Sequence, residues 1–279
     1  METIIGLGQA GCNIAGKFLQ YPQYDVYRID SENHKGPKFK KIIEKSSHEE
    51  YEEACPSFKR FFKNAKPPYL FIVGGGSTIS GMSLRMLQQL DSKDINILYV
   101  KPDLSLMPQV KQIQDRITFN ILQEYTRSAV FKRIYIVSNS VLEDILGDVP
   151  IVGYYEKLND LIVNTIHMIN VYKNTKPVMN TFSESIETAR ISTFGLIDID
   201  TGEKKLFYSL QLPRELVYYY SIDEKQLEMD GKLLKKITDQ IKEEQESKIK
   251  VSFGIYPNNY KQNYGYVVSH ATLVQNQNI

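Results

Sequence analysis

Short apolar runs alternate with longer amphipathic stretches through the first half of the chain. Glycine, proline or charged residues bound each apolar run, as is typical of buried strands, and the runs lie at residues 3–6, 25–29, 69–73, 95–100 and 134–137. Apolar residues at helical spacing predict helices at 11–19, 49–64 and 108–131, and a further helix that ends at residue 90. This alternation predicts a parallel sheet covered by helices, in which ligands bind at the carboxyl ends of the strands.

The pattern changes after residue 150. Residues 151–172 are predicted to form one long amphipathic helix. Beyond it we expect a hairpin formed by residues 191–199 and 205–212. A charged helix is expected at 223–248, interrupted near Gly231, and two final strands at 251–256 and 264–272. The sequence therefore predicts a smaller domain with a mixed sheet in the second half of the chain.

The composition narrows the class of protein. The chain has 279 residues, of which 42% are hydrophobic and 24% charged, and its formal net charge is +1. We therefore expect a globular protein without a basic surface for direct binding of nucleic acid. The longest apolar runs are far shorter than the roughly 20 residues that cross a bilayer, so no membrane insertion is expected. Cys12 and Cys55 lack the spacing of a disulfide scaffold or a zinc site, and a cytoplasmic location is predicted.

A first glycine motif lies where the first predicted strand meets the first helix. Residues 6–11 read GLGQAG. Glycines let the backbone approach a phosphate closely, and the helix N-terminus supplies free N–H groups and a favourable dipole. With Asp30 at the end of the second strand, the motif also fits a Rossmann-type NAD(P)-binding oxidoreductase. A glycine turn that only packs a helix on a strand is a further alternative.

A second glycine motif, GGGSTISG at residues 74–81, again lies between a buried strand and a helix. Two such turns at one edge of a sheet predict a polyphosphate held between them, whereas a dinucleotide fold needs only one. This segment resembles the tubulin signature GGGTGSG, with Ser77 and Ile79 in place of two glycines. Residues 8–14, followed by Lys17 and Phe18, resemble the tubulin pattern GQxGxxI followed by KF.

Two further segments resemble the tubulin/FtsZ superfamily. Ser138-Asn139-Ser140 follows a predicted strand and is similar to the guanine-contacting loop of that superfamily. Residues 155–161 read YEKLNDL and are similar to the tubulin pattern YxxLNxL. The resemblance implies that Gln9 lies beside the phosphates and metal, that Asn13 faces the base or ribose, and that Tyr155 stacks on guanine. It implies a nucleotide site formed by Gly8, Gln9, Ala10, Gly11, Cys12, Asn13, Gly75, Gly76, Ser77, Thr78, Ile79, Ser80, Gly81, Asn139, Tyr155 and Asn159.

The loop expected to complete hydrolysis departs from the family pattern. In tubulin-like filaments an acidic loop of one subunit, NxDxxD or NxDxxE, acts on the nucleotide of the next subunit. The corresponding stretch here reads NTFSES at residues 180–185, so Asn180 fits but Phe182 and Ser185 stand where acids belong. Asn180 and Glu184 are the catalytic candidates, and displacement of a carboxylate by one residue lowers the expected rate. A tubulin-like scaffold that does not hydrolyse nucleotide is therefore a second alternative.

The resemblance implies an α/β fold with a parallel-sheet nucleotide-binding domain of the tubulin/FtsZ type, joined by a long central helix to a smaller α/β domain. We expect a GTP-binding domain at 1–150, the central helix and following loop at 151–180, and the smaller domain at 181–279. The implied ligands are GTP or GDP and Mg²⁺, and the implied partner is the chain itself in a head-to-tail filament. The small size suggests a member encoded by a phage or plasmid.

Overall fold

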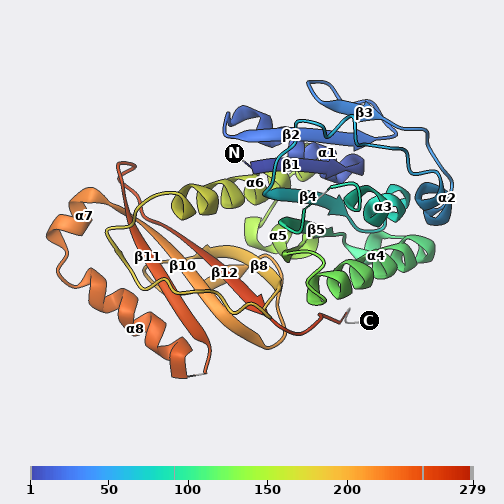
Figure 1. Ribbon diagram of the computed structural model, residues 1–279. Helices are drawn as coiled ribbons and strands as arrows, with labels where there is room; N and C mark the ends of the chain where they lie inside the picture. Colours follow the sequence, from blue (N-terminus) through green and yellow to red (C-terminus); the bar gives the residue numbers. More distant parts are fainter. Residues whose placement is uncertain (1, 91, 247, 277–279) are drawn as a thin grey trace. The chain divides into compact units, whose positions relative to one another are not determined.

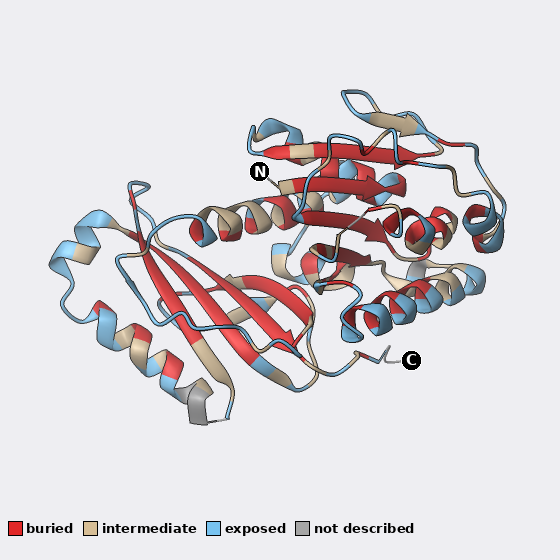
Figure 2. Ribbon diagram, viewed as in Figure 1, coloured by how far each residue is buried: buried red, intermediate tan, exposed pale blue. Residues whose placement is uncertain are grey.

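The computed structural model describes residues 2–90, 92–246 and 248–276 (Figure 1). Contacts divide the chain into two compact units, and the division falls between Val163 and Asn164, inside helix α6 (Tyr154–Lys173). The first unit holds the residues up to Val163, and the second runs from Asn164 to Gln275. Both units bury most residues of their longer strands (Figure 2).

The first unit contains a parallel sheet with the strand order β3-β2-β1-β4-β5-β6. The strands are β1 (Glu2–Leu7), β2 (Tyr24–Asp30), β3 (Phe39–Lys41), β4 (Tyr69–Gly74), β5 (Ile95–Lys101) and β6 (Arg133–Ser138). All five strands predicted for this half are present, because each is largely apolar and mostly buried. The short strand β3 was not predicted.

Helices and short 3-10 turns connect these strands, namely α1 (Gly8–Lys17), η1 (Phe18–Gln20), α2 (His48–Glu53), η2 (Thr78–Met82), α3 (Ser83–Leu87), η3 (Leu104–Leu106), α4 (Gln109–Arg127) and α5 (Asn139–Leu146). The predicted helix 49–64 is wrong beyond Glu53, since turns and irregular backbone follow. The physical reason is Pro56, which has no N–H group and disfavours helical backbone at Cys55.

Helix α1 begins directly after strand β1, without an intervening loop. Gly8 makes this possible because it adopts φ +70°, a conformation that favours glycine. One turn later, a side chain at Gly11 would overlap the carbonyl of Ile72 on the neighbouring strand β4. These glycines therefore allow α1 to pack closely on the sheet, where it buries Ile14 and Ala15.

The second unit contains a mixed sheet with the order β9-β8-β12-β10-β11-β7, in which only β10 and β11 are parallel neighbours. Its strands are β7 (Met179–Asn180), β8 (Ile191–Ile197), β9 (Lys204–Leu206), β10 (Pro213–Asp223), β11 (Lys250–Asn258) and β12 (Tyr264–Ala271). The longest strand, β10, was not predicted, and the hairpin strand expected at 205–212 ends at Leu206.

Two helices in the second unit follow β10, α7 (Glu224–Met229) and α8 (Leu233–Glu246), and the expected interruption lies between them. Helix α8 packs Ile237 against Tyr218 and Tyr220 of β10. Tyr219 alternates to the other face, where it stacks on Tyr172 of α6 with ring centroids 6.3 Å apart. The sheet is therefore covered on both faces. No helix among the described residues combines the length and apolar character that a membrane span requires.

Candidate functional site

The two glycine motifs meet at the carboxyl edge of the parallel sheet. Strands β1 and β4 are parallel neighbours in which Leu7 is opposite Val73, so both turns leave the sheet at the same level. A Cβ atom added at Gly74 would lie 2.9 Å from Cβ of Ala10, and one added at Gly8 would lie 2.7 Å from Cγ2 of Ile79. The second turn therefore packs directly on the first, and glycine is required for the contact.

The first turn presents a polar surface and an open helix N-terminus. Gln9, Ala10 and Asn13 are exposed, whereas Gly11 and Cys12 are buried beneath them. Within the described residues no side chain caps α1, and its first turn carries no acidic residue. The free N–H groups and positive dipole end of the helix therefore face outward, as anion binding requires.

The second turn divides into an accessible part and a buried part. Gly75, Ser77 and Thr78 are half-buried at the surface. Gly76 has φ +69° and packs against Met107. Ile79 and Ser80 are instead enclosed, only 4% and 2% exposed, so their side chains support the turn from beneath.

The buried hydroxyl of Ser80 belongs to a network below the second turn. Ser80 Oγ donates to the carbonyl of Ser77 at 2.6 Å and lies 3.1 Å from Thr118 Oγ1. His48 Nε2 lies 3.0 Å from the same carbonyl, and burial lowers the pKa of this histidine. Ser47 accepts the N–H of Glu50 through its side chain and so caps α2.

Two charged residues beside the second turn have no counterpart in the sequence motifs. Lys111 of α4 donates from Nζ to Thr78 Oγ1 at 3.1 Å and places a cation at the turn. Asp115 is completely buried under Gly75, where Tyr99 Oη donates to its Oδ1 at 2.5 Å. Lys101 Nζ lies 3.5 Å from Asp115 Oδ2, and burial lowers the pKa of Lys101.

Asp103, which follows β5, and Asp115 of α4 both have local partners. Asp115 is enclosed by the contacts just described. Asp103 accepts the N–H of Ser105 at 2.9 Å and its hydroxyl at 2.7 Å, which caps η3. Asp30, on which the dinucleotide interpretation depends, is 3% exposed and lies 2.7 Å from Nε2 of His34. Asp30 and Asp115 are therefore buried, whereas Asp103 is half-buried.

Side chains from three helices bring the remaining predicted residues near one another. Asn139 begins α5 directly after β6, and Tyr155 and Asn159 lie one turn apart near the start of α6. Lys17 of α1 pairs with Asp160 of α6 at 2.6 Å. Tyr155 is 63% exposed and Asn159 half-buried, so both side chains are accessible.

A second contact joins α6 to α5. Tyr154 Oη donates to Glu143 Oε2 at 2.7 Å, so the first turn of α6 is held against the helix that Asn139 begins. Burial and the neighbouring carboxylate raise the pKa of Tyr154 to about 12. Together with the pair between α1 and α6, this hydrogen bond fixes all three helices at the sheet edge.

In the second unit, the predicted hydrolytic loop is anchored by its aromatic residue. Asn180 ends β7 and accepts the N–H of Phe182 through Oδ1 at 3.2 Å. The ring of Phe182 packs on Tyr219, with centroids 5.7 Å apart, and lies over Gly254. The side chain of Glu184 is exposed, while its backbone carbonyl accepts from Lys250. Phe182 therefore has a packing role where the family pattern has an acid.

The lysine cluster of residues 38–41 is also largely engaged. Lys38 pairs with Asp25. Lys40 Nζ donates to the carbonyl of Ser57 at 3.1 Å and lies 4.6 Å from the ring centre of Phe58. These contacts stabilise the strand β3 edge, and both Lys38 and Lys41 remain exposed.

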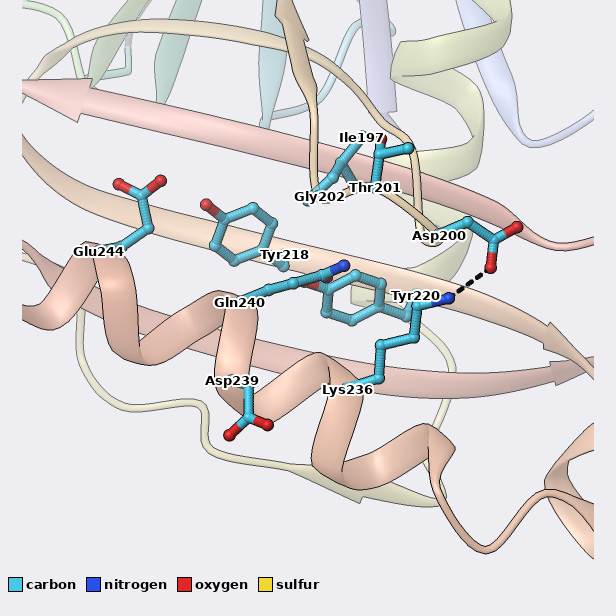
Figure 3. Close-up of a pocket in the computed structure, with 10 residues that line it drawn as sticks. All are labelled: Ile197, Asp200, Thr201, Gly202, Tyr218, Tyr220, Lys236, Asp239, Gln240 and Glu244. Carbon is cyan, nitrogen blue, oxygen red and sulfur yellow. Dashed lines mark hydrogen bonds and ion pairs between the residues drawn. The ribbon is translucent and has the colours of Figure 1, made fainter.

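A pocket of about 330 Å³ lies under α8 in the second unit and contains none of the predicted site residues (Figure 3). Tyr218 and Tyr220 form its floor with nearly parallel rings, 5.8 Å between centroids. Lys236 and Asp200 form an ion pair of 2.5 Å at its side. The pocket is a feature of packing between the helix and the sheet that no sequence motif indicates.

The chain has the fold of solved FtsZ, TubZ and CetZ structures, as the sequence predicted. The chain resembles FtsZ of M. jannaschii with a TM-score of 0.69 and 11% identity, over 97% of this chain and 88% of that one. It resembles a GTPγS-form protofilament of TubZ from Bacillus thuringiensis serovar israelensis with a TM-score of 0.74 and 12% identity, over 96% of this chain and 86% of that one. It resembles GDP-bound CetZ1 from Haloferax volcanii with a TM-score of 0.70 and 15% identity, over 98% of this chain and 94% of that one. No protein-family model and no curated protein sequence matches.

Proposed function

We propose that this chain binds a guanine nucleotide at the carboxyl edge of its parallel sheet and assembles head to tail into filaments. The observation that carries the proposal is the direct contact of two glycine turns from neighbouring strands, Ala10 against Gly74 and Gly8 against Ile79. One glycine turn at a helix N-terminus suits a single phosphate group, whereas two adjoining turns suit a polyphosphate.

The phosphate side of the proposed site consists of backbone N–H groups and one cation. The open N-terminus of α1 would bind one part of the polyphosphate, and the turn around Gly75 and Gly76 another. Lys111, held near Thr78, would offset phosphate charge. Mg²⁺ binds oxygen ligands and phosphates and retains several waters, so the exposed amide oxygen of Gln9 and the hydroxyl of Thr78 fit it as protein ligands.

The base side rests on Asn13, Asn139, Tyr155 and Asn159. The ion pair between Lys17 and Asp160 supports this assignment, because Asn13 lies one turn before Lys17 on α1 and Asn159 directly precedes Asp160 on α6. An amide offers a donor and an acceptor together, as the edge of guanine requires. The exposed ring of Tyr155 would stack on the base.

Assembly would place the 180–187 loop of one subunit against the nucleotide of the next. Such a head-to-tail contact is heterologous and generates an open filament. The solved relatives include a TubZ protofilament and a four-stranded TubZ filament. Glu184 and Glu187 are exposed in this loop, and Glu184 is the carboxylate proposed to orient the attacking water.

A light-scattering assay with parallel phosphate release tests the proposal. Purified chain with Mg²⁺ receives GTP, GDP, ATP or NADH in separate runs. Scattering that appears only with GTP, and decays as phosphate accumulates, is the expected result, and Glu184→Ala is expected to prolong it. Absence of any response to GTP, together with no guanine nucleotide in the denatured protein, would refute the proposal. A response to NADH would instead support the alternative of a Rossmann-type NAD(P)-binding oxidoreductase.

The packing of Phe182 favours a second candidate function, a filament scaffold that binds GTP without hydrolysing it. The ring lies on Tyr219 and Gly254, so this loop position is built for packing rather than for acid–base chemistry. The same assay separates the two functions. A stable polymer with GTP and no phosphate release would identify the scaffold, whereas turnover that rises cooperatively with protein concentration would exclude it.

A further inference from the structure

Three side chains of metal-ligand type come together beneath the first glycine turn. Cys12 Sγ, a carboxylate oxygen of Asp30 and Nε2 of His34 all lie within 4.8 Å of one another. Among the described side chains they are the one group of three or more His, Cys, Asp and Glu residues with this proximity. The spacing of these residues along the chain matches no zinc motif, so the sequence argued against a zinc site. The fold nevertheless brings them together.

The backbone holds each of the three side chains in place. Cys12 is on the buried face of α1, and its thiol lies 3.3 Å from the carbonyl of Ile29. Asp30 ends β2, and its Oδ1 accepts the N–H of Ser31 at 2.7 Å, which turns Oδ2 toward His34. The ring of His34 packs against Phe39 of β3, 5.5 Å between centroids. The three ligand atoms are therefore positioned by α1, by the end of β2 and by the turn that follows it.

We propose that Cys12, Asp30 and His34 bind a divalent transition-metal ion of the Zn²⁺ class. Thiolate, imidazole and carboxylate are the three side-chain ligands that zinc uses, and a tetrahedral site separates them by roughly 3.3–3.6 Å. Since all three atoms lie within 4.8 Å of one another, each separation has to close by at most about 1 Å. A sulfur and a nitrogen ligand exclude Mg²⁺, which requires oxygen. The side chain of His34 is 12% exposed and offers the path by which an ion enters.

Charge and proton balance are compatible with such an ion. The Cys12 thiol loses its proton to solvent as the sulfur–metal bond forms, and the resulting thiolate and the Asp30 carboxylate neutralise the two positive charges. His34 binds as the neutral imidazole. The buried Arg28 donates from Nη2 to the carbonyl of Lys35 at 2.6 Å, so a backbone oxygen already accepts from its guanidinium.

A bound ion would join the segment after β2 to α1, the helix that begins at the first glycine turn. It would thereby hold residues 31–38 and restrain the helix that presents Gln9 and Asn13. This inference does not depend on guanine-nucleotide binding, because the Cys12 and Asp30 side chains are buried, whereas Gln9 and Asn13 are exposed. A metal site and a nucleotide site are therefore separately testable on the same protein.

A titration of the metal-free full chain with Co²⁺ alone, without nucleotide, tests the site. Wild type is expected to develop a thiolate-to-cobalt charge-transfer band in the near ultraviolet at one ion per chain, and Zn²⁺ is expected to abolish it. Cys12→Ser removes the band. Cys55→Ser is the matched control, since it removes the other cysteine, and it retains the band. A band that is absent from wild type, or that survives in Cys12→Ser, would overturn the inference.

His34→Ala keeps the test decisive if Cys12→Ser fails to fold. His34 lies in a turn between β2 and β3, so its loss is expected to leave the fold intact. Loss of a ligand should weaken Co²⁺ and Zn²⁺ binding by at least about 100-fold, more than loss of an outer hydrogen-bonding partner. Zn²⁺ should raise the melting temperature of wild type and of His167→Ala, but not of His34→Ala. Equal Zn²⁺ affinity of wild type and His34→Ala would show that the group is only a hydrogen-bonded pair.

Discussion

The two units bury their strands in different ways. In the first unit every strand is parallel, and the polypeptide leaves the sheet through glycine turns that carry the candidate site. In the second unit the sheet is mixed, and its interior is filled by tyrosines such as Tyr219, Tyr256 and Tyr266. Backbone geometry therefore matters most in the first unit, and side-chain packing in the second.

This difference between backbone geometry and side-chain packing indicates which changes each unit tolerates. A parallel sheet requires a crossover after each strand, and the tight crossovers here depend on positions without a side chain, such as Gly11. A sheet buried between α8 and the end of α6 depends on large side chains remaining neutral. The first unit should therefore be sensitive to added atoms, and the second to charge.

Alkaline pH should produce the largest effect, and it should act first on the second unit. Burial raises the pKa of Tyr218, Tyr220 and Tyr266 above the ordinary value, and that of Tyr256 to about 12. Unfolded tyrosines lose their protons from about pH 10, so above that pH the folded state holds more protons and stability falls as pH rises. Each such tyrosine contributes a loss of up to about 1.4 kcal/mol per pH unit until its folded pKa is reached.

Hydrogen exchange between pH 9 and 12 would locate this transition. Amides of β10, β11 and β12 are expected to lose protection before those of β1 and β4. Burial also raises the pKa of Tyr99 in the first unit, so that unit should follow at higher pH. Earlier loss of protection in β1 and β4 would contradict the proposed difference between the units.

Gly11→Val should destabilise the first unit by about 3 kcal/mol, because its side chain meets the carbonyl of Ile72 and forces α1 away from β4. Urea unfolding measures the change. Gly231→Val, in the second unit, is the matched control, since a Cβ atom there meets nothing within 4 Å. Equal losses for the two variants would show that α1 has room to move.

The strands of the first unit were predictable because each is a short, largely apolar segment bounded by glycine, proline or polar residues. Strand β10 was missed because it contains Glu215 and then three consecutive tyrosines, which give neither a clean alternation nor a simple apolar run. Its identity depends on β11 and β12, which pair with it from distant parts of the sequence. Such pairing is a tertiary property.

The candidate site was predictable where backbone conformation alone specifies it. Glycines at strand-to-helix junctions indicated both turns. The supporting residues Lys111 and Asp115 belong to α4 and lie more than thirty positions from the turn that they contact. Helical spacing in the sequence does not indicate which neighbour such a residue meets, so these contacts could not be predicted.

Phe182→Asp replaces a packed aromatic ring by a carboxylate in the second unit. It restores an acid at the position of the family pattern and removes the ring from Tyr219. If the proposed function holds, phosphate release per filament should rise about 100-fold, the lower end of what a positioned carboxylate contributes. Phe182→Leu keeps an apolar contact and should leave the rate unchanged. An identical rate in both variants would contradict a catalytic role for this position.

Tyr155→Ala should weaken GTP binding about tenfold, because stacking of one base on an aromatic ring contributes about 1–3 kcal/mol. The ring is 63% exposed, so its removal should change the free energy of unfolding little. Tyr125→Ala on α4, where the ring is 39% exposed, is the control and should bind GTP as wild type does. Isothermal titration of both variants measures the difference, and an equal loss would remove Tyr155 from the proposed base site.

The smallest effect should come from the ion pair between Lys17 and Asp160, although it joins two helices of the candidate site. The side chains are 26% and 53% exposed, so solvent and salt screen their attraction. A double-mutant cycle with Lys17→Met and Asp160→Asn should give a coupling free energy of about 0.5 kcal/mol, which decreases with added salt. A coupling well above 1 kcal/mol would mean that charge, and not the glycine turns, holds this part of the first unit together. Both units would then depend on side chains, and they would differ only in the charges that those side chains carry.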